Sequence, residues 1–369
     1  MPPRDRIRGI DAARAVALIG MVATHILETE RSDGSPTLVG FLFDGRASAL
    51  FAVLAGTGLA LATRGLPDGR AQLAAGAGIA VRAALIAVIG LVLADLDPRP
   101  LVILAYYGVL FLVAIPLLRV PAGALAALAV VWCGLSPVLS HLLRDEARYP
   151  AQVGLEALAD PAGLLWTLTV AGVYPVLTWT TYLLAGLAVG RTDLRSPRVA
   201  TVLLAGGAAL SAAASGASAL LLDAGGAAVL GRAATTEFYG TTPTGTWWWL
   251  AVDAPHSGTP FDLARTTGSA LAVLGFMLLL ARVAAPLLWL PAAIGAAPLT
   301  LYVLHTVLTT VDVGADPDPL PLFLGHVVLL AVAGAALSVM GARGPLEAAV
   351  SAASRSVRTR VLAAERARS

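Results

Sequence analysis

Apolar segments of about 20 residues recur along this chain, and they limit its fold more than any other feature. Each segment is long enough to cross a hydrocarbon core of roughly 30 Å as an α-helix. Hydrophobic residues make up 57% of the 369 residues and charged residues 13%, whereas a soluble domain carries roughly 25% charged residues. We therefore predict an all-α, polytopic membrane protein.

The segments predict about ten transmembrane helices in one bundle, because most connections between them are short. Residues 1–342 form this predicted transmembrane domain. The approximate spans are 8–28, 46–63, 73–94, 101–118, 121–142, 173–190, 199–222, 263–281, 287–311 and 320–341.

The arginines orient the predicted bundle. With the N-terminus in the cytoplasm, sixteen arginines fall in cytoplasmic segments and five in the opposite loops. Cytoplasmic loops are enriched in basic residues, so both termini are predicted to be cytoplasmic. Asp11 and Arg14 within the first apolar stretch, together with its length, indicate a retained helix and not a cleaved signal peptide. Residues 343–369 are predicted to form a basic amphipathic helix on the cytoplasmic leaflet.

Several classes of function find no support in the composition. A net charge of +2 gives no reason to expect nucleic acid as a partner. Cys133 is the one cysteine, so neither a disulfide within the chain nor a cysteine metal site is available. The sequence has no P-loop or dinucleotide-binding motif. The glycine-rich strings at 74–80 and 205–210 lie in apolar helices, where close helix packing explains them.

Ionisable residues inside the apolar segments are the candidates for chemistry, because each costs about 2.5–3.5 kcal/mol at membrane depth. Asp11 and Arg14 lie three residues apart on one helix face. They form either a structural ion pair or a handle for the polar part of a cytoplasmic cofactor. His25 follows Arg14 by eleven residues, a rise of roughly 16 Å, and so lies near the outer end of the same helix.

Other polar residues gather on the predicted outer side. They are Arg46 at the start of the 46–63 helix, Asp253, His256, Ser257 and Arg265 around the turn before the 263–281 helix, and Tyr302 and His305 in 287–311. His256 is either functional or a solvated loop residue, and His305 either functional or a packing residue bonded to a neighbouring Tyr or Thr. No spacing supports a zinc site, and no metal is expected. His141 and His326 are assigned structural roles.

The spacing from Arg14 to His25 resembles the Arg-x10-His motif of acyltransferase family 3 membrane proteins. The wider stretch RIRGIDAARAVALIGMVATH is similar to the bacterial family that resembles heparan-α-glucosaminide N-acetyltransferase. Residues 45–61, 253–275 and 296–306 also resemble members of that family. Two departures stand out. Ala15 replaces a usual Gly, and residues 29–43 lack the histidine that the animal lysosomal enzyme uses, with His25 at the position of an Asn in that enzyme.

The resemblance implies a membrane acyltransferase. The donor would be acyl-CoA, with acetyl-CoA as the expected form, entering from the cytoplasm. The acceptor would be a hydroxyl or amine of an extracytoplasmic glycan, lipid or metabolite. Such a transfer needs a base with a pKa near 7, which imidazole supplies. It proceeds either by direct attack or through an acylated histidine, and which histidine is the base stays open.

We predict His25, His305, His256 and Asp253 as catalytic residues, and Asp11, Arg14, Arg46, Ser257, Arg265 and Tyr302 as binding residues. The expected partners are the acceptor, membrane lipids and a second copy of the chain in a homodimer. The expected location is the plasma membrane of a bacterium. The alternative function is a secondary transporter or lipid flippase that uses the intramembrane Asp, Arg and His residues. Matching halves with Gly- or Pro-interrupted helices, which are typical of transporters, are not seen.

Overall fold

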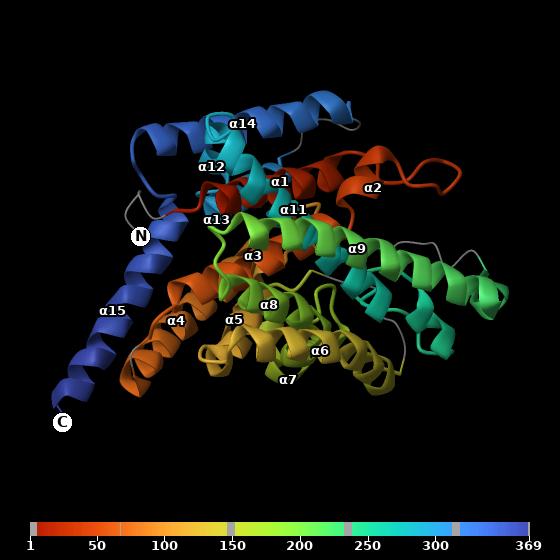
Figure 1. Cartoon of the computed structure of the whole chain (residues 1–369), viewed down its shortest axis with the longest axis horizontal. Helices are drawn as coiled ribbons and strands as arrows, with labels where there is room; N and C mark the ends of the chain where they lie inside the picture. Colours follow the sequence, from red (N-terminus) through yellow and green to blue (C-terminus); the bar gives the residue numbers. More distant parts are fainter. Residues whose placement is uncertain (1–5, 67, 146–151, 232–237, 312–317, 368–369) are drawn as a thin grey trace.

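The computed structural model describes residues 6–66, 68–145, 152–231, 238–311 and 318–367, and this part of the chain forms helices and no strand. The all-α prediction is confirmed. The helices, drawn in Figure 1, are α1 (Arg8–Ile26), α2 (Leu38–Phe43), α3 (Arg46–Ala62), α4 (Gly69–Ala94), α5 (Leu104–Ala114), α6 (Ala122–Leu143), α7 (Pro161–Trp166), α8 (Val176–Gly190), α9 (Pro197–Leu221), α10 (Ala227–Leu230), α11 (Pro260–Val283), α12 (Trp289–Ile294), α13 (Pro298–Leu308), α14 (Pro319–Val339) and α15 (Pro345–Ala367).

Among the described residues, seven helical segments are long and apolar enough to cross a membrane. They are α1, α2 with α3, α4, α6, α9 with α10, α11 and α14. An eighth is formed if α7 and α8 count as one span, bent by 58°. The polytopic membrane architecture is thus confirmed, while the number of ten spans stays a prediction.

The continuous helix predicted over 287–311 is wrong, because the structure divides it into α12 and α13. Pro298 is the first residue of α13, a position where its missing N–H is not needed. The residue before a proline is disfavoured in the α conformation, and Ala297 leaves it with φ −127° and ψ 52°. Tyr302 and His305 therefore lie on a short helix that begins inside the bundle.

The surface around the helix bundle is apolar, which suits contact with membrane lipid. Large hydrophobic side chains are exposed along the outward faces of α6, α9 and α14, among them Val130, Val202 and Val332. By contrast, α8 is buried along almost its whole length. α1 is largely buried too and packs against α3, α11 and α12 (Figure 1).

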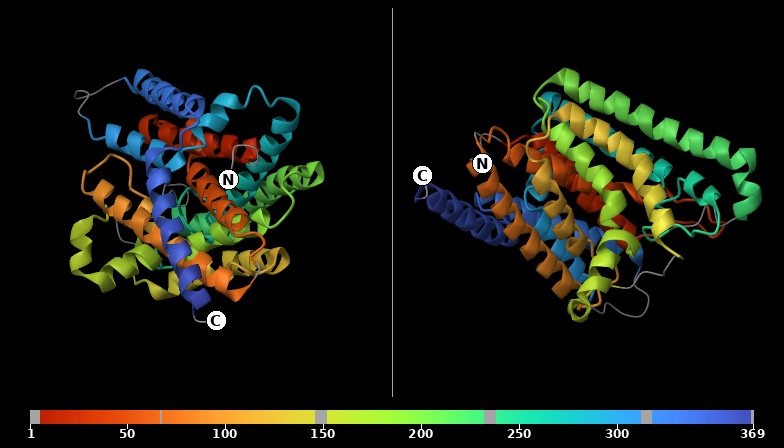
Figure 2. Two further views of the ribbon diagram at one scale, coloured as in Figure 1. Left: turned by 90° about the vertical axis from the view of Figure 1, so that its left-hand side faces the viewer. Right: turned by 90° about the horizontal axis from the view of Figure 1, so that it is seen from below.

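Glycines allow the closest helix contacts. α9 runs beside α11 at an edge of the bundle (Figure 2). A Cβ atom on Gly207 of α9 would stand 2.5 Å from the carbonyl oxygen of Gly268 in α11. Such an approach needs small residues at the interface. The packing interpretation of the 205–210 string is therefore confirmed at Gly207.

α15 lies along α4, and its far end projects from the bundle beside the C-terminus (Figures 1 and 2). Ser354 donates a hydrogen bond of 2.7 Å to the carbonyl oxygen of Gly78 in α4. Near its start, the Glu347 carboxylate accepts from the N–H groups of Leu299 and Thr300 at 2.6 and 3.1 Å. These are the first unpaired donors of α13. α15 thus caps the helix that carries Tyr302 and His305.

Candidate active site

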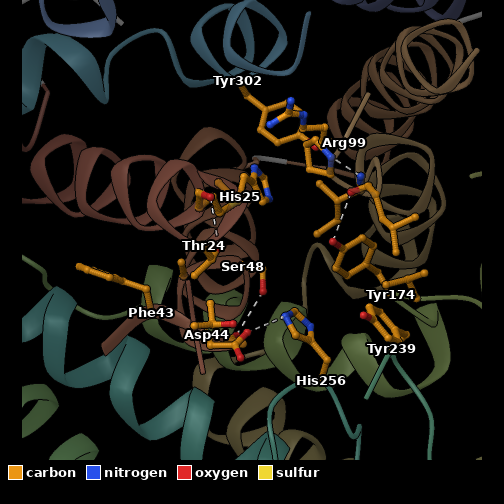
Figure 3. A pocket seen from close by; sticks show the side chains of 18 residues that line it. Thr24, His25, Phe43, Asp44, Ser48, Arg99, Tyr174, Tyr239, His256 and Tyr302 are labelled. Carbon is orange, nitrogen blue, oxygen red and sulfur yellow. Dashed lines mark hydrogen bonds and ion pairs between the residues drawn. The ribbon is translucent and has the colours of Figure 1, made fainter. Parts of the chain in front are cut away.

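A cavity of about 240 Å³ lies between α1, the junction of α2 with α3, and the segments before α5 and α8 (Figure 3). Three of the predicted residues, His25, His256 and Tyr302, line it.

His25 is joined to His305 across the interface of α1 and α13. Nδ1 of His25 lies 3.0 Å from Nε2 of His305, and the two rings are nearly parallel. His305 has no exposed surface and lies behind the cavity wall. In the described part of the chain, the second ring nitrogen of His25, Nε2, makes no hydrogen bond. It is therefore the nitrogen that can meet a ligand in the cavity.

His326 of α14 extends this pair to three histidines. Its Nδ1 lies 2.8 Å from Nδ1 of His305, so both nitrogens of the central ring are engaged. His326 was predicted to be structural, because it lies outside the stretches that resemble the family. His305 and His326 lie 21 positions apart in the sequence, and no local spacing predicts their contact.

His256 approaches the cavity from a strained turn. Its φ of 55° is in the left-handed region, which few residues other than Gly adopt, although His is among those that tolerate it. The turn is held by the N–H of Gly240, which donates to the carbonyl oxygen of His256 at 2.7 Å. Such backbone strain clusters at functional sites.

Asp44 is the charged partner of His256. Its Oδ1 lies 3.5 Å from Nε2 of His256, and both side chains line the cavity (Figure 3). Asp44 was not predicted from the sequence. The available signal was an Asp followed by Gly45, a turn residue with φ 67°, just before the helix that Arg46 begins.

Further residues of the cavity were also not predicted. They are Thr24, Ser48, Arg99, Tyr174 and Tyr239 among the side chains drawn in Figure 3. Arg99 and Tyr239 are exposed, so the cavity meets the surface on their side. The hydroxyl of Tyr302 accepts from the N–H of Ile103 at 3.5 Å, which leaves its own proton to donate.

Asp253 and Arg265, which were also predicted for the outer side, belong to a separate ion network. Nε of Arg265 lies 3.8 Å from Oδ2 of Asp253, and Nη2 of Arg265 lies 3.3 Å from Oδ1 of Asp262. Asp253 also accepts from Ser215 at 2.8 Å. None of these side chains lines the cavity. The structure thus places Asp253 against α9 and α11 and not against a histidine of the cavity.

Two other predicted binding residues also point elsewhere. The hydroxyl of Ser257 lies 3.3 Å from that of Thr259, inside the turn before α11. The Arg46 guanidinium lies over the ring of Phe41, 5.2 Å from its centre. Both side chains brace the segments that carry His256 and Asp44.

Asp11 and Arg14 form a second polar cluster towards the other end of α1. The buried Asp11 carboxylate accepts from Arg14 at 2.8 Å and from Arg6 at 3.0 Å. Arg14 and His25 therefore belong to different surroundings on one helix. The likeness of their spacing to the acyltransferase family 3 motif stays a prediction.

Within the described ranges, no group of three His, Cys, Asp or Glu side chains is arranged to hold a metal ion. The three histidines contact one another directly through ring nitrogens, at distances of hydrogen bonds.

A comparison with known proteins identifies the family of this chain. A sequence profile described as "Heparan-alpha-glucosaminide N-acetyltransferase, catalytic" matches residues 6–221, more than half of the chain. The match includes α1 and Asp44, and it ends before His256, His305 and His326. No curated protein matches the chain. The chain belongs to the heparan-alpha-glucosaminide N-acetyltransferase catalytic family, and this membership implies a membrane acetyltransferase.

Proposed function

We propose that this protein transfers an acetyl group from acetyl-CoA to a hydroxyl or amine of a glycan, lipid or metabolite outside the cytoplasm. Family membership supports the reaction type. The single observation that carries the site is the cavity shared by His25 and the His256–Asp44 pair. Two imidazoles facing one space can take a proton from the acceptor and return one to the leaving group.

In the proposed reaction, His25 is the general base. The acceptor oxygen or nitrogen attacks the thioester carbonyl carbon, and Nε2 of His25 takes the acceptor proton. His305 holds Nδ1 of His25 at 3.0 Å and so orients the ring. A base whose second nitrogen is held in this way keeps its lone pair directed at the substrate.

His256 is proposed as the acid. The carbon–sulfur bond breaks as the tetrahedral intermediate collapses, and the CoA thiolate receives a proton from the His256 imidazolium. The Asp44 carboxylate, 3.5 Å away, stabilises that imidazolium. Tyr302 and Arg99 line the same cavity and are the proposed donors to the oxyanion.

The donor is proposed to bind along α1. The cavity holds the thioester end, while Arg14 meets a phosphate of CoA at the other polar cluster, next to Asp11. Arg82 of α4, which lies over the ring of Phe111, is the proposed second cation there. With the N-terminus in the cytoplasm, this arrangement takes acetyl-CoA from inside and presents its acyl end to the outer side.

The alternative, a secondary transporter or lipid flippase, draws on the same buried histidines, which are also suited to a proton pathway. One experiment separates the two. Purified protein in lipid nanodiscs receives acetyl-CoA carrying a labelled acetyl group, with amino sugars and neutral sugars as separate acceptors. We expect labelled product and free CoA thiol in equal amounts. No transfer and no acetyl-CoA binding, together with solute uptake driven by a proton gradient in proteoliposomes, would establish the alternative.

A further inference from the structure

His25, His305 and His326 form an unbroken row of imidazoles that crosses from α1 through α13 to α14. The two nitrogen–nitrogen distances are 3.0 and 2.8 Å, and the central ring uses both of its nitrogens. His305 is fully buried and His326 is 9% exposed. The row begins at the cavity and continues away from it, since neither His305 nor His326 lines the cavity.

The hydrogen-bonding capacity of imidazole restricts how protons occupy this row. A neutral imidazole carries one N–H donor and one acceptor nitrogen. If all three rings are neutral and both hydrogen bonds are made, two arrangements exist. In one, Nδ1 of His25 donates to His305, and Nδ1 of His305 donates to His326. In the other, both bonds run in the opposite direction, and Nε2 of His25 carries the proton.

The two arrangements differ in what the cavity meets. In the first, Nε2 of His25 offers a lone pair and can act as a base. In the second, the same nitrogen offers an N–H and cannot accept a proton. The choice is shared by all three rings, so the tautomer of His326 is linked to the chemistry of His25 through His305.

We infer that His326 is a positioning residue for the transfer: by accepting a hydrogen bond from Nδ1 of His305, it holds His305 and then His25 in the tautomers that leave the lone pair of His25 Nε2 in the cavity. This inference rests on the proposed function, because the base role of His25 selects the direction. Without the acceptor on α14, Nδ1 of His305 has no partner in the row. Both tautomers of His305 then become available, and the base form of His25 is less populated.

The kinetic test compares two variants at one position. His326→Leu removes the acceptor, and we expect kcat to fall by about 10- to 100-fold, within the contribution of a general base. KM for acetyl-CoA should change by less than about twofold, because the residue does not contact substrate. His326→Asn supplies an amide oxygen near the place of Nδ1, and we expect it to restore most of kcat. Equal losses in both variants, or no loss in either, would overturn the inference.

His141 gives the matched control. It lies in the last turn of α6 against Trp247, with ring centres 4.6 Å apart, and it does not line the cavity. His141→Leu and His141→Asn should leave kcat unchanged. Thermal unfolding in detergent identifies any variant whose loss of rate comes from misfolding.

A spectroscopic test does not depend on turnover. The chain has five histidines, so ¹⁵N-histidine labelling with one variant at a time assigns the ring nitrogens. We expect the Nδ1–H tautomer at His25 and His305, the Nε2–H tautomer at His326, and mixed tautomers at His25 in His326→Leu. The Nε2–H tautomer at His25 of the wild type, or a His25 spectrum unchanged by His326→Leu, contradicts the inference. An inactive wild-type protein would overturn the proposed function instead, and the ring spectra would still decide the arrangement of protons.

Discussion

Nδ1 of His25 lies 3.0 Å from Nε2 of His305, although 279 residues separate the two along the chain. The bond crosses from the first helix to a short helix that begins inside the bundle. The bond fixes the orientation of the His25 ring at the end of an apolar helix.

His305→Leu removes the partner of His25 Nδ1 while keeping a side chain of similar size in a fully buried place. We expect kcat to fall by about 10- to 100-fold, because the ring of the base is no longer held. Binding of acetyl-CoA, measured by calorimetry in nanodiscs, should be retained. A variant that turns over at the wild-type rate would show that the bond between the two histidines has no part in the reaction.

The variants Asp44→Asn and Asp253→Asn should differ in kcat, although each removes a carboxylate close to His256. Asp44 is close in space, and Asp253 is close in sequence. Asp44 faces His256 at 3.5 Å, whereas Asp253 pairs with Arg265 and Ser215 outside the cavity. We expect kcat to fall by about tenfold or more in Asp44→Asn, since the imidazolium loses its counter-charge, and by much less in Asp253→Asn. The measurement is the steady-state rate of CoA release. The reverse order would assign the orienting role to Asp253.

Arg14→Gln tests the donor end of α1. A charge-assisted hydrogen bond to phosphate contributes about 1.5–3 kcal/mol, so we expect KM for acetyl-CoA to rise by about tenfold or more with kcat little changed. The substitution also affects the structure, because Asp11 loses Arg14 as an ion-pair partner. Asp11 keeps Arg6 as a partner at 3.0 Å. Arg355→Gln, on an exposed position of α15, is the control. If KM is unchanged while the melting temperature drops, Arg14 is a structural ion-pair residue.

Gly207→Leu should weaken the pairing of α9 with α11. A side chain there meets the backbone of Gly268, and overpacking of this kind costs about 1–3 kcal/mol. Gly206→Leu is the matched control, since a Cβ at Gly206 has no atom within 4 Å. Thermal unfolding in one detergent measures both. Equal melting temperatures would mean that α9 moves to accept the larger residue.

The sequence was enough to predict where most of the long helices lie, because each depends on a local run of apolar residues. It was not enough at 287–311, where an uncharged apolar run conceals the break at Pro298. The proline signal was present, but the length of the run pointed to a single span. The break matters for function because it sets where α13 begins and hence where His305 meets His25.

The candidate site was predictable only where its residues stand out locally in the sequence. His25 and Tyr302 stand out as polar residues in apolar helices with a family-like surrounding. His326 also stands in an apolar helix, and its contact with His305 exists only in three dimensions. Asp253 is three residues from His256 in sequence, yet the left-handed turn at His256 directs the two side chains to different neighbours. Closeness in the sequence does not predict partners across such a turn.

The most direct test of the account is acetyl transfer by His25→Gln. Gln keeps a polar side chain on α1 but has no nitrogen that can take up a proton near neutral pH. In nanodiscs, with acetyl-CoA binding measured on the same sample, we predict that the variant binds the donor with nearly the wild-type affinity and transfers at least about 10²-fold more slowly. Transfer at the wild-type rate by a variant that binds acetyl-CoA normally would contradict the assignment of His25 as the base.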